Sequence, residues 1–202
     1  VRSQRPLGRG GGPDCGERVV EHEALGITLR AEGFATLGLG RIDHDPVVGD
    51  LAGFVASIYK RSVPYVQIAS TLVAQVDSSV GGKTGIDLPE GKNLLGTFYQ
   101  PRAVLADTAT LNTLDGRQLS SGVAEVIKYG AIRDKKFLDF LAVQMPALLA
   151  LDVPVLEKVV TTSAGIKADI VQQDETESNL RRILNFGHTI GHAIESFSLI
   201  VD

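Results

Sequence analysis

The sequence predicts an α/β domain over residues 1–115, followed by an all-helical domain over residues 116–202. In the first part, residues 64–68 and 101–107 form short apolar runs with the length and composition of buried strands. A segment whose apolar residues recur at helical spacing precedes the first run, and alternation of strands with helices is typical of a parallel sheet. After Asp115 the apolar spacing is helical throughout.

Composition and charge exclude several classes of protein. The net charge of -4 gives no positive surface for nucleic acid, and no run of eighteen apolar residues predicts a membrane span. The single cysteine, Cys15, excludes an internal disulfide and fits a reducing compartment, so we expect a cytoplasmic protein. Because the chain begins with Val1 and has one methionine, Met145, we expect a piece of a longer reading frame.

The first 46 residues carry little pattern. Residues 1–12 are rich in Arg and Gly and predict a flexible leader, and residues 17–32 predict a weak helix. From Val47 the pattern strengthens. A helix is predicted from apolar residues at helical spacing, namely Leu51, Phe54, Val55, Ile58 and Tyr59.

Two hydroxyl side chains, Ser70 and Thr71, directly follow the strand predicted at residues 64–68. Ligands of parallel sheets gather at the carboxyl ends of the strands, so these hydroxyls are placed to contact a cofactor phosphate. Residues 108–114 follow the second predicted strand and indicate a loop that leaves the sheet.

Residues 76–85, VDSSVGGKTG, indicate an anion site, because a glycine pair can wrap an anion with backbone N–H groups while Lys83 adds charge. The segment is not a Walker A loop, since Asp77 stands where that motif requires Gly. The alternative is an exposed glycine turn. Downstream, Lys92 and Asn93 add a cation and an amide beside a glycine-rich turn.

Residues 181–195, RRILNFGHTIGHAIE, predict an α-helix with a polar stripe on one face. Two histidines at i and i+4 can share a metal ion. The alternative is an ordinary amphipathic helix with its polar face in water, although the two glycines in the segment disfavour a helix by about 1 kcal/mol each. The stripe consists of Arg181, Asn185, His188, His192 and Glu195.

The helical part supplies further polar groups. Ser120 and Ser121 can cap a helix in which Glu125 and Lys128 lie on neighbouring turns, either as a surface ion pair or with the carboxylate as a buried ligand. Residues 135–149 predict a helix, and Pro154 begins another that runs to residue 171 and carries Lys167.

The motifs VVGDLAGF, YKR, VDSSVGGKTG, GKNLLGTFYQP, DTATLNTL, GVAEVIKYG, IKADIV and LRRILNFGHTIGHAIE occur in this order over residues 47–195. Because these motifs occur together and in this order, the chain resembles 3-dehydroquinate synthase. The resemblance implies a Rossmann-like NAD-binding α/β domain followed by a helical metal-binding domain. It implies conversion of 3-deoxy-arabino-heptulosonate 7-phosphate to 3-dehydroquinate and phosphate in the shikimate pathway, by transient oxidation with NAD, phosphate elimination, reduction and aldol cyclisation.

The resemblance also assigns roles to residues. Zn²⁺ or Co²⁺ would be bound by Glu125 and His188, whereas His192 would contact substrate phosphate and transfer protons. Arg61 would reach the partner's site in a homodimer. Catalytic residues would be Asp77, Lys83, Lys128 and His192. Substrate would contact Arg61, Lys83, Asn93, Lys167, Arg181, Asn185 and His192. NAD would contact Asp50, Ser70, Thr71, Lys83, Lys92, Thr110, Leu111, Asn112 and Thr113.

The chain departs from the family pattern at three places. Family chains have a longer N-terminal sheet, of which only residues 14–17 resemble the loop that contacts the NAD ribose. Residues 43–46, DHDP, occupy the position of a glycine-rich turn, and their two carboxylates would repel the NAD pyrophosphate. The chain stops at Asp202, before the family's second histidine ligand, so two of three metal ligands are present. Two alternatives are therefore a related sugar phosphate cyclase, of the 2-epi-5-epi-valiolone or 2-deoxy-scyllo-inosose synthase type, and an inactive fragment.

Overall fold

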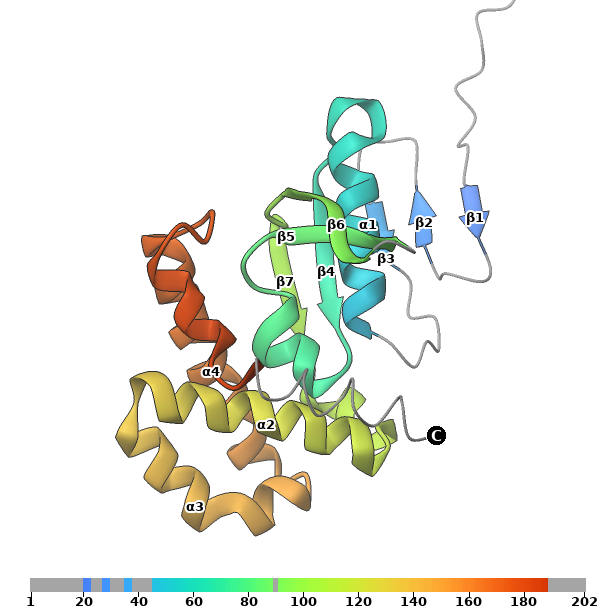
Figure 1. The fold of residues 1–202 in the computed structure, drawn as a ribbon. Helices are drawn as coiled ribbons and strands as arrows, with labels where there is room; N and C mark the ends of the chain where they lie inside the picture. The colour runs from blue at the N-terminus through green and yellow to red at the C-terminus, as the bar shows by residue number, and fades with distance from the viewer. Residues whose placement is uncertain (1–19, 23–26, 30–34, 38–44, 89–90, 189–202) are drawn as a thin grey trace, which may run out of the picture.

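The computed structural model describes residues 20–22, 27–29, 35–37, 45–88 and 91–188. The sheet has five strands in the order β1-β2-β3-β4-β7 (Figure 1). β3 pairs in parallel with β4, and β4 in parallel with β7, whereas β1 and β2 join antiparallel. The strand bounds are β1 Val20–His22, β2 Ile27–Leu29, β3 Ala35–Leu37, β4 Tyr65–Ala69 and β7 Ala103–Ala106. The parallel part of the sheet is as predicted.

The helix predicted over residues 17–32 is wrong, because β1 and β2 lie there. Ile27 and Leu29 alternate with Thr28, and this period of two suits a strand better than a helix.

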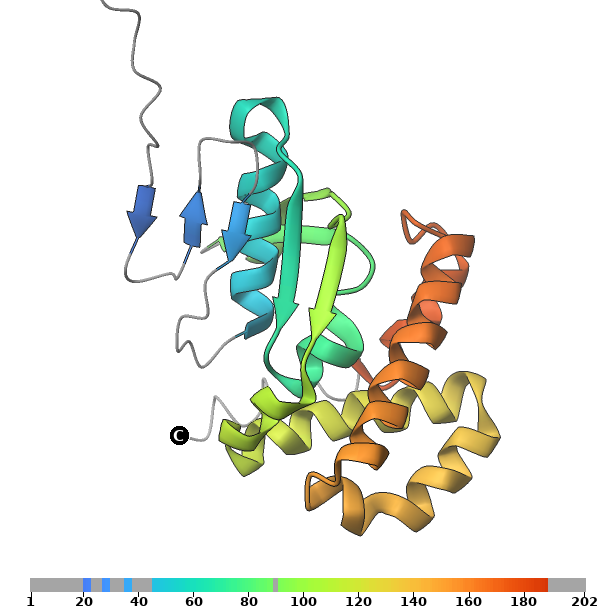
Figure 2. The same cartoon turned by 180° about the vertical axis from the view of Figure 1, so that it is seen from behind.

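One face of the sheet is covered by α1 (Asp45–Ile58) and by the hairpin of β5 (Lys83–Leu88) and β6 (Gly91–Phe98), as Figures 1 and 2 show from opposite sides. Small residues on α1 allow close approach. A Cβ on Gly49 would lie 2.4 Å from Gln67 Nε2 on β4, and a Cβ on Gly53 would lie 2.5 Å from Thr84 Cγ2 on β5. The helix begins before the predicted segment, and Pro46 lies in its first turn, where no backbone donor is needed.

Three long helices lie at the carboxyl ends of β4 and β7: α2 (Gly116–Arg133), α3 (Lys135–Leu149) and α4 (Val153–Gln173). An aspartate caps each of them. Asp115 accepts from Gln118 N at 2.8 Å, Asp134 from Phe137 N at 3.0 Å, and Asp152 from Val155 N at 3.2 Å.

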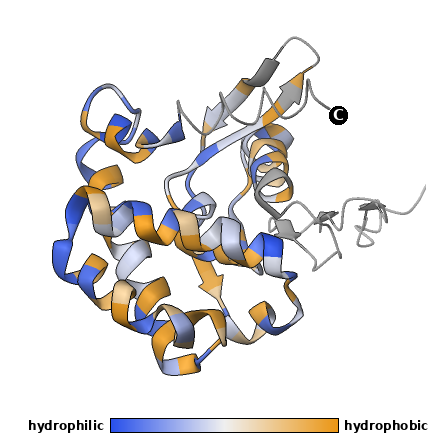
Figure 3. Ribbon diagram, turned by 60° about the horizontal axis from the view of Figure 1, so that its bottom comes forward, coloured by the Kyte–Doolittle hydropathy of each residue, from blue (hydrophilic) through white to orange (hydrophobic). Residues whose placement is uncertain are grey.

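The predicted cap at Ser120 and Ser121 is wrong. Both residues lie inside α2, and their hydroxyls donate to the carbonyls of Gly116 and Arg117. Pro154 lies in the first turn of α4, as predicted. The three helices pack through their apolar faces (Figure 3). Leu72, Val76 and Leu111 from the α/β part join this core, so the two parts share it. Within the described ranges, no helix is long and apolar enough to cross a bilayer.

Candidate active site between the sheet and the helices

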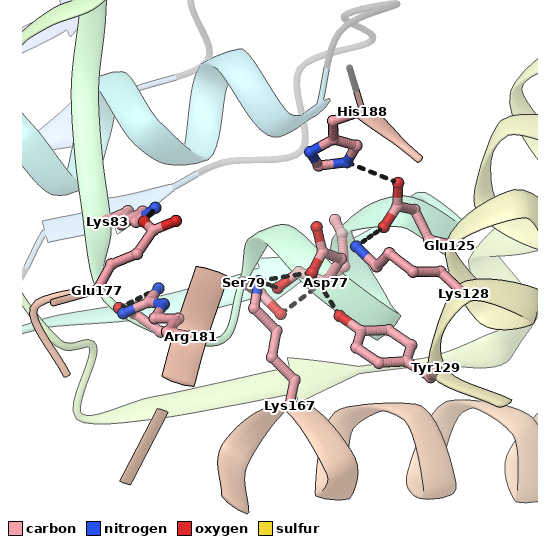
Figure 4. Close-up of polar contacts among 12 residues, drawn as sticks. Asp77, Ser79, Lys83, Glu125, Lys128, Tyr129, Lys167, Glu177, Arg181 and His188 are labelled. Carbon is pink, nitrogen blue, oxygen red and sulfur yellow. Dashed lines mark hydrogen bonds and ion pairs between the residues drawn. The ribbon is translucent and has the colours of Figure 1, made fainter. Parts of the chain in front are cut away.

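Asp77 lies at the centre of the candidate site (Figure 4). The chain leaves β4 and forms a short π-helical segment, η2 (Ala74–Ser78), against which α2 and α4 pack. Asp77 Oδ1 lies 2.7 Å from Lys167 Nζ of α4 and accepts from the Tyr129 hydroxyl of α2 at 2.5 Å. Lys167 Nζ also donates to the Asp77 carbonyl at 2.7 Å. Three elements distant in sequence are therefore joined at one carboxylate.

The neighbours of Asp77 keep it charged. Burial alone would raise its pKa, but the positive charges of Lys167 and Lys128, with hydrogen bonds from Lys167 and Tyr129, lower the pKa to about 2. Burial lowers the pKa of Lys167, and Asp77 opposes that effect. Burial and the nearby carboxylate raise the pKa of Tyr129 well above its ordinary value, so this hydroxyl acts as a donor.

A second group lies beside Asp77 on α2. Lys128, which is buried, pairs with Glu125. The Glu125 side chain is 21% exposed, and its other oxygen lies 3.7 Å from His188 Nε2. The ion pair predicted between Glu125 and Lys128 is present, but it faces the interior of the site rather than the protein surface.

Glu125 and His188 could together hold a metal ion. Two ligand atoms about 2.0 Å from one tetrahedral zinc lie roughly 3.3 Å apart, and the observed 3.7 Å is close to this spacing. Carboxylate and imidazole are common zinc ligands. Among the described residues no cluster of three or more His, Cys, Asp or Glu occurs.

The helix predicted over residues 181–195 is wrong in its first half. Residues 180–185 form a 3₁₀ turn, η4 (Leu180–Asn185), and Gly187 has φ +85°, a left-handed conformation that ends one element before His188 begins the next. His192 and Glu195 lie outside the described residues. Arg181, Asn185 and His188 nevertheless line one cavity, although they do not share a helix face.

The acidic turn, residues 174–178, lies before η4 and is held in shape by Asp174. Its carboxylate accepts from the backbone N–H groups of Ser178 and Asn179, each at 2.8 Å, and of Arg181 at 3.0 Å. These bonds lower the pKa of Asp174, because they favour the charged carboxylate. The turn thereby fixes the backbone position of Arg181, from which its side chain extends.

The first glycine of the pair at residues 81 and 82 contacts Arg181. Both glycines have positive φ, and Arg181 Nη2 donates to the Gly81 carbonyl at 2.9 Å. A Cβ on Gly81 would lie 2.4 Å from this nitrogen, so the close approach requires glycine. Arg181 Nη1 donates to the Glu175 carbonyl at 2.6 Å. Burial lowers the pKa of Arg181, which stays charged.

Lys83 follows the glycine pair as the first residue of β5. Its ammonium pairs with Glu177 of the acidic turn, and Glu177 Oε1 also accepts from Asn185 Nδ2 at 2.8 Å. Burial and the charges of Arg181 and Lys167 lower the pKa of Lys83.

A cavity of about 390 Å³ is lined by residues of α1, η2 and β5 on one side and of α2, α4 and η4 on the other. Its lining includes Asp50, Asp77, Lys83, Lys128, Lys167, Glu177, Arg181, Asn185 and His188. The structure therefore brings together most of the predicted substrate and metal residues. A neighbouring cavity of about 430 Å³, between α1 and the hairpin, shares Asp50, Lys83 and Glu177 with it.

Two residues of the site were not predicted. Tyr129 lies 52 positions from Asp77 in sequence, and Glu177 is one of several acidic residues in a turn. The position of Tyr129 directly after Lys128 is the signal that could have indicated the first, and no pattern in the sequence indicated the second.

Six of the nine predicted NAD residues, namely Ser70, Thr71 and residues 110–113, follow the carboxyl ends of β4 and β7. Thr110 Oγ1 donates to the Ser70 carbonyl at 3.0 Å, and Thr71 Oγ1 accepts from Ala74 N at 3.2 Å. Residues 108–113 form a 3₁₀ helix, η3 (Thr108–Thr113), rather than the predicted loop, because Asp107 caps it by accepting from Ala109 N.

The other predicted contacts divide by exposure. Asn112 and Thr113 are exposed, whereas the Leu111 side chain lies in the core and leaves only its backbone for a ligand. Lys92 and Asn93 are in β6, and their side chains lie outside what the structure describes. Arg61 is exposed in a short 3₁₀ turn, η1 (Tyr59–Arg61), and does not line either cavity.

Comparison with known proteins shows which family the chain resembles in sequence. The chain matches the sequence models of the 3-dehydroquinate synthase N-terminal part over residues 30–121 and of its C-terminal part over residues 122–201. It is 59% identical over 150 residues to 3-dehydroquinate synthase of Symbiobacterium thermophilum, covering 74% of this chain and 42% of the relative. It is 57% identical over 150 residues to that of Teredinibacter turnerae, with the same coverage. The chain thus spans about two fifths of the length of these curated relatives.

Solved structures give the same relationship at lower identity. The fold matches 2-epi-5-epi-valiolone synthase of Streptomyces hygroscopicus, solved with NAD⁺ and Zn²⁺, with a TM-score of 0.67 and 34% identity over 71% of this chain and 40% of that one. It matches 2-deoxy-scyllo-inosose synthase, complexed with carbaglucose-6-phosphate, NAD⁺ and Co²⁺, with a TM-score of 0.69 and 31% identity over 74% of this chain and 41% of that one. From the matching halves of the family pattern and the relatives of the same name, the chain belongs to the 3-dehydroquinate synthase family.

Proposed function

We propose that this chain carries the central part of a 3-dehydroquinate synthase active site, and that the protein converts 3-deoxy-arabino-heptulosonate 7-phosphate to 3-dehydroquinate and phosphate. The observation that carries the proposal is the convergence of Lys83, Lys128, Lys167 and Arg181 on one cavity, beside Glu125 and His188. A substrate with a phosphate and a carboxylate needs several cations in one place, and this cavity provides them.

The cofactors of the proposal are NAD and a divalent metal, Zn²⁺ or Co²⁺. When bound, NAD supplies a hydride acceptor and donor, and the metal supplies a Lewis acid for a substrate hydroxyl. Glu125 and His188 would hold the metal. Ser70, Thr71 and residues 110–113 would hold NAD at the carboxyl ends of the strands, with Asp50, Lys83 and Lys92 contributing from α1 and the hairpin.

The chain's own residues position the substrate and stabilise the leaving phosphate. Lys83, Asn93 and His192 are proposed to bind the phosphate, whereas Lys167, Arg181 and Asn185 are proposed to bind the carboxylate. Their fixed orientation lowers the entropic cost of elimination, and the cations stabilise the charge on the departing phosphate. Asp77 keeps Lys167 in place, and His192 is proposed to move protons.

We also propose a cytoplasmic homodimer in which Arg61 reaches the partner's site. The exposed position of Arg61 at the end of α1, away from its own cavity, supports this role. The division into a Rossmann-like NAD-binding domain over residues 1–115 and a metal-binding domain over residues 116–202 is supported by the start of α2 at Gly116. The oligomeric state of the purified protein checks the homodimer, and its NAD and metal content checks the two binding domains.

Turnover of three sugar phosphates tests the proposal. The purified protein, extended to the length of its relatives and supplied with NAD and Zn²⁺, is assayed for phosphate release from heptulosonate phosphate, sedoheptulose phosphate and glucose 6-phosphate. We expect release from the first. Preference for either of the others would favour the second candidate, a related sugar phosphate cyclase, which the two structural matches support.

The 202-residue chain alone is assayed in parallel. Release by it would show that these residues suffice. No release by the chain together with release by the extended protein would make the chain an inactive piece of an active enzyme, and loss of Zn²⁺ on dialysis would agree with that reading.

A further inference from the structure

The carboxylate of Glu177 contacts Lys83 and Asn185, two of the groups proposed to bind anions in the site. It pairs with Lys83, whose side chain is 50% exposed, while its own side chain is 17% exposed. The same carboxylate accepts from Asn185 Nδ2 at 2.8 Å. Lys83 and Asn185 are both among the residues proposed to bind the substrate's anions. Glu177 contacts Lys83 (Figure 4) and Asn185 as an anionic ligand would.

The turn that carries Glu177 does not need this contact to keep its shape. Asp174 accepts from three backbone N–H groups of the turn and from the Ser178 hydroxyl, and Arg181 Nη1 donates to the Glu175 carbonyl. The ends of the turn are thereby fixed on both sides of Glu177. The Glu177 side chain can leave Lys83 without loss of those bonds.

Two other carboxylates of the site, Asp77 and Glu125, have partners other than Lys83 and Asn185. Asp77 is held by Lys167 and Tyr129, and Glu125 pairs with Lys128 beside His188. Glu177, by contrast, sits on the wall shared by the 390 Å³ cavity and the neighbouring 430 Å³ cavity. Its departure would release a cation and an amide together and open one cavity to the other.

From these contacts we propose that Glu177 is an internal competitor for the anion site, displaced from Lys83 and Asn185 when a phosphate-bearing ligand binds. The proposal rests on the proposed function for the identity of the natural ligand, but its test uses inorganic phosphate. A partly exposed ion pair is weak, so a phosphate dianion can replace it. The competition reduces affinity and couples ligand binding to movement of the Glu177 side chain.

The test measures the Kd of inorganic phosphate by isothermal titration calorimetry for the extended protein and for Glu177→Gln. We expect Glu177→Gln to lower the Kd by about two- to fivefold, the range that corresponds to an exposed ion pair. Glu175→Gln is the matched control, because it removes the same charge from the same turn. Its carboxylate accepts from Gln100 Nε2 at 3.1 Å and does not line either cavity. We expect its Kd to stay at the native value.

An unchanged or higher Kd for Glu177→Gln, an equal decrease in both variants, or no phosphate binding by any of the three proteins would overturn the proposal. Glu177→Ala provides a second variant with the same expectation, and thermal unfolding confirms that each protein is folded. Phosphate binding with the expected ratio but no turnover of any sugar phosphate would keep this proposal and refute the proposed function. Turnover with equal Kd values would do the reverse.

Discussion

Replacing Asp77 with Asn tests whether the partly buried carboxylate at the centre of the site stabilises the fold through its charge. Asn has the same shape, and Lys167 Nζ can still donate to the backbone carbonyl of residue 77. The ion pair with Lys167 and the charge that accepts from Tyr129 are removed. The change from the ordinary pKa of 3.8 to about 2 corresponds to about 2.5 kcal/mol, at roughly 1.36 kcal/mol per pKa unit.

The pH dependence gives the sign. Because the pKa is lower in the folded protein than in the unfolded chain, the stabilisation is present above about pH 4 and is lost as the pH falls through about 2. We expect Asp77→Asn to lower the free energy of unfolding by about 2–3 kcal/mol at pH 7. The difference from the native protein should narrow as the pH approaches 2.

Urea unfolding followed by circular dichroism, at several pH values, measures this difference. Asp139→Asn is the control, because Asp139 forms an exposed pair with Lys135 at 2.9 Å on α3. We expect it to change the free energy of unfolding by less than about 0.5 kcal/mol. A difference for Asp77→Asn that is the same at every pH, or a variant as stable as the native protein, would refute the reasoning.

Two further predictions concern packing and the hydroxyl at Asp77. Gly122→Ala in α2 would place a Cβ 2.5 Å from Leu72 Cβ, so it should destabilise the protein by about 1–3 kcal/mol. Gly165→Ala in α4 meets nothing within 4 Å and should stabilise the protein by about 0.5–1 kcal/mol. Thermal unfolding distinguishes the two variants, and equal effects on stability would contradict the packing described for Gly122. Tyr129→Phe removes the donor to Asp77 and should cost about 1.5–3 kcal/mol in urea unfolding, and clearly less in the Asp77→Asn background, whereas additive losses would show that the two groups do not interact.

Local signals in the sequence were sufficient to predict much of the fold. Pro154 indicated the start of α4, and the apolar run at residues 64–68 indicated β4. The break at Gly187 was missed, because apolar spacing continues across it and only the backbone conformation reveals the turn. The hairpin of β5 and β6 was missed because its glycines and lysines resembled an anion loop.

The candidate site was predictable as a set of residues but not as a geometry. Asp77, Lys128, Lys167 and Arg181 come from separate segments, and only folding shows that Lys167, 90 positions away, bonds to Asp77. Tyr129 and Glu177 could not be chosen from sequence spacing, since their roles depend on partners in other elements. The glycine pair before Lys83 was expected to bind an anion through backbone N–H groups, and this stays a prediction. The structure adds a role for Gly81, whose carbonyl accepts from Arg181.

We propose that phosphate is eliminated in the 390 Å³ cavity lined by Lys83, Lys167 and Arg181. The most direct measurement is phosphate release from heptulosonate phosphate by the extended protein with NAD and Zn²⁺, compared for native protein, Lys83→Ala and the exposed control Lys135→Ala. We predict that Lys83→Ala reduces kcat by on the order of 10²–10³ while remaining folded, and that Lys135→Ala keeps the native rate. A near-native rate in Lys83→Ala would contradict the account.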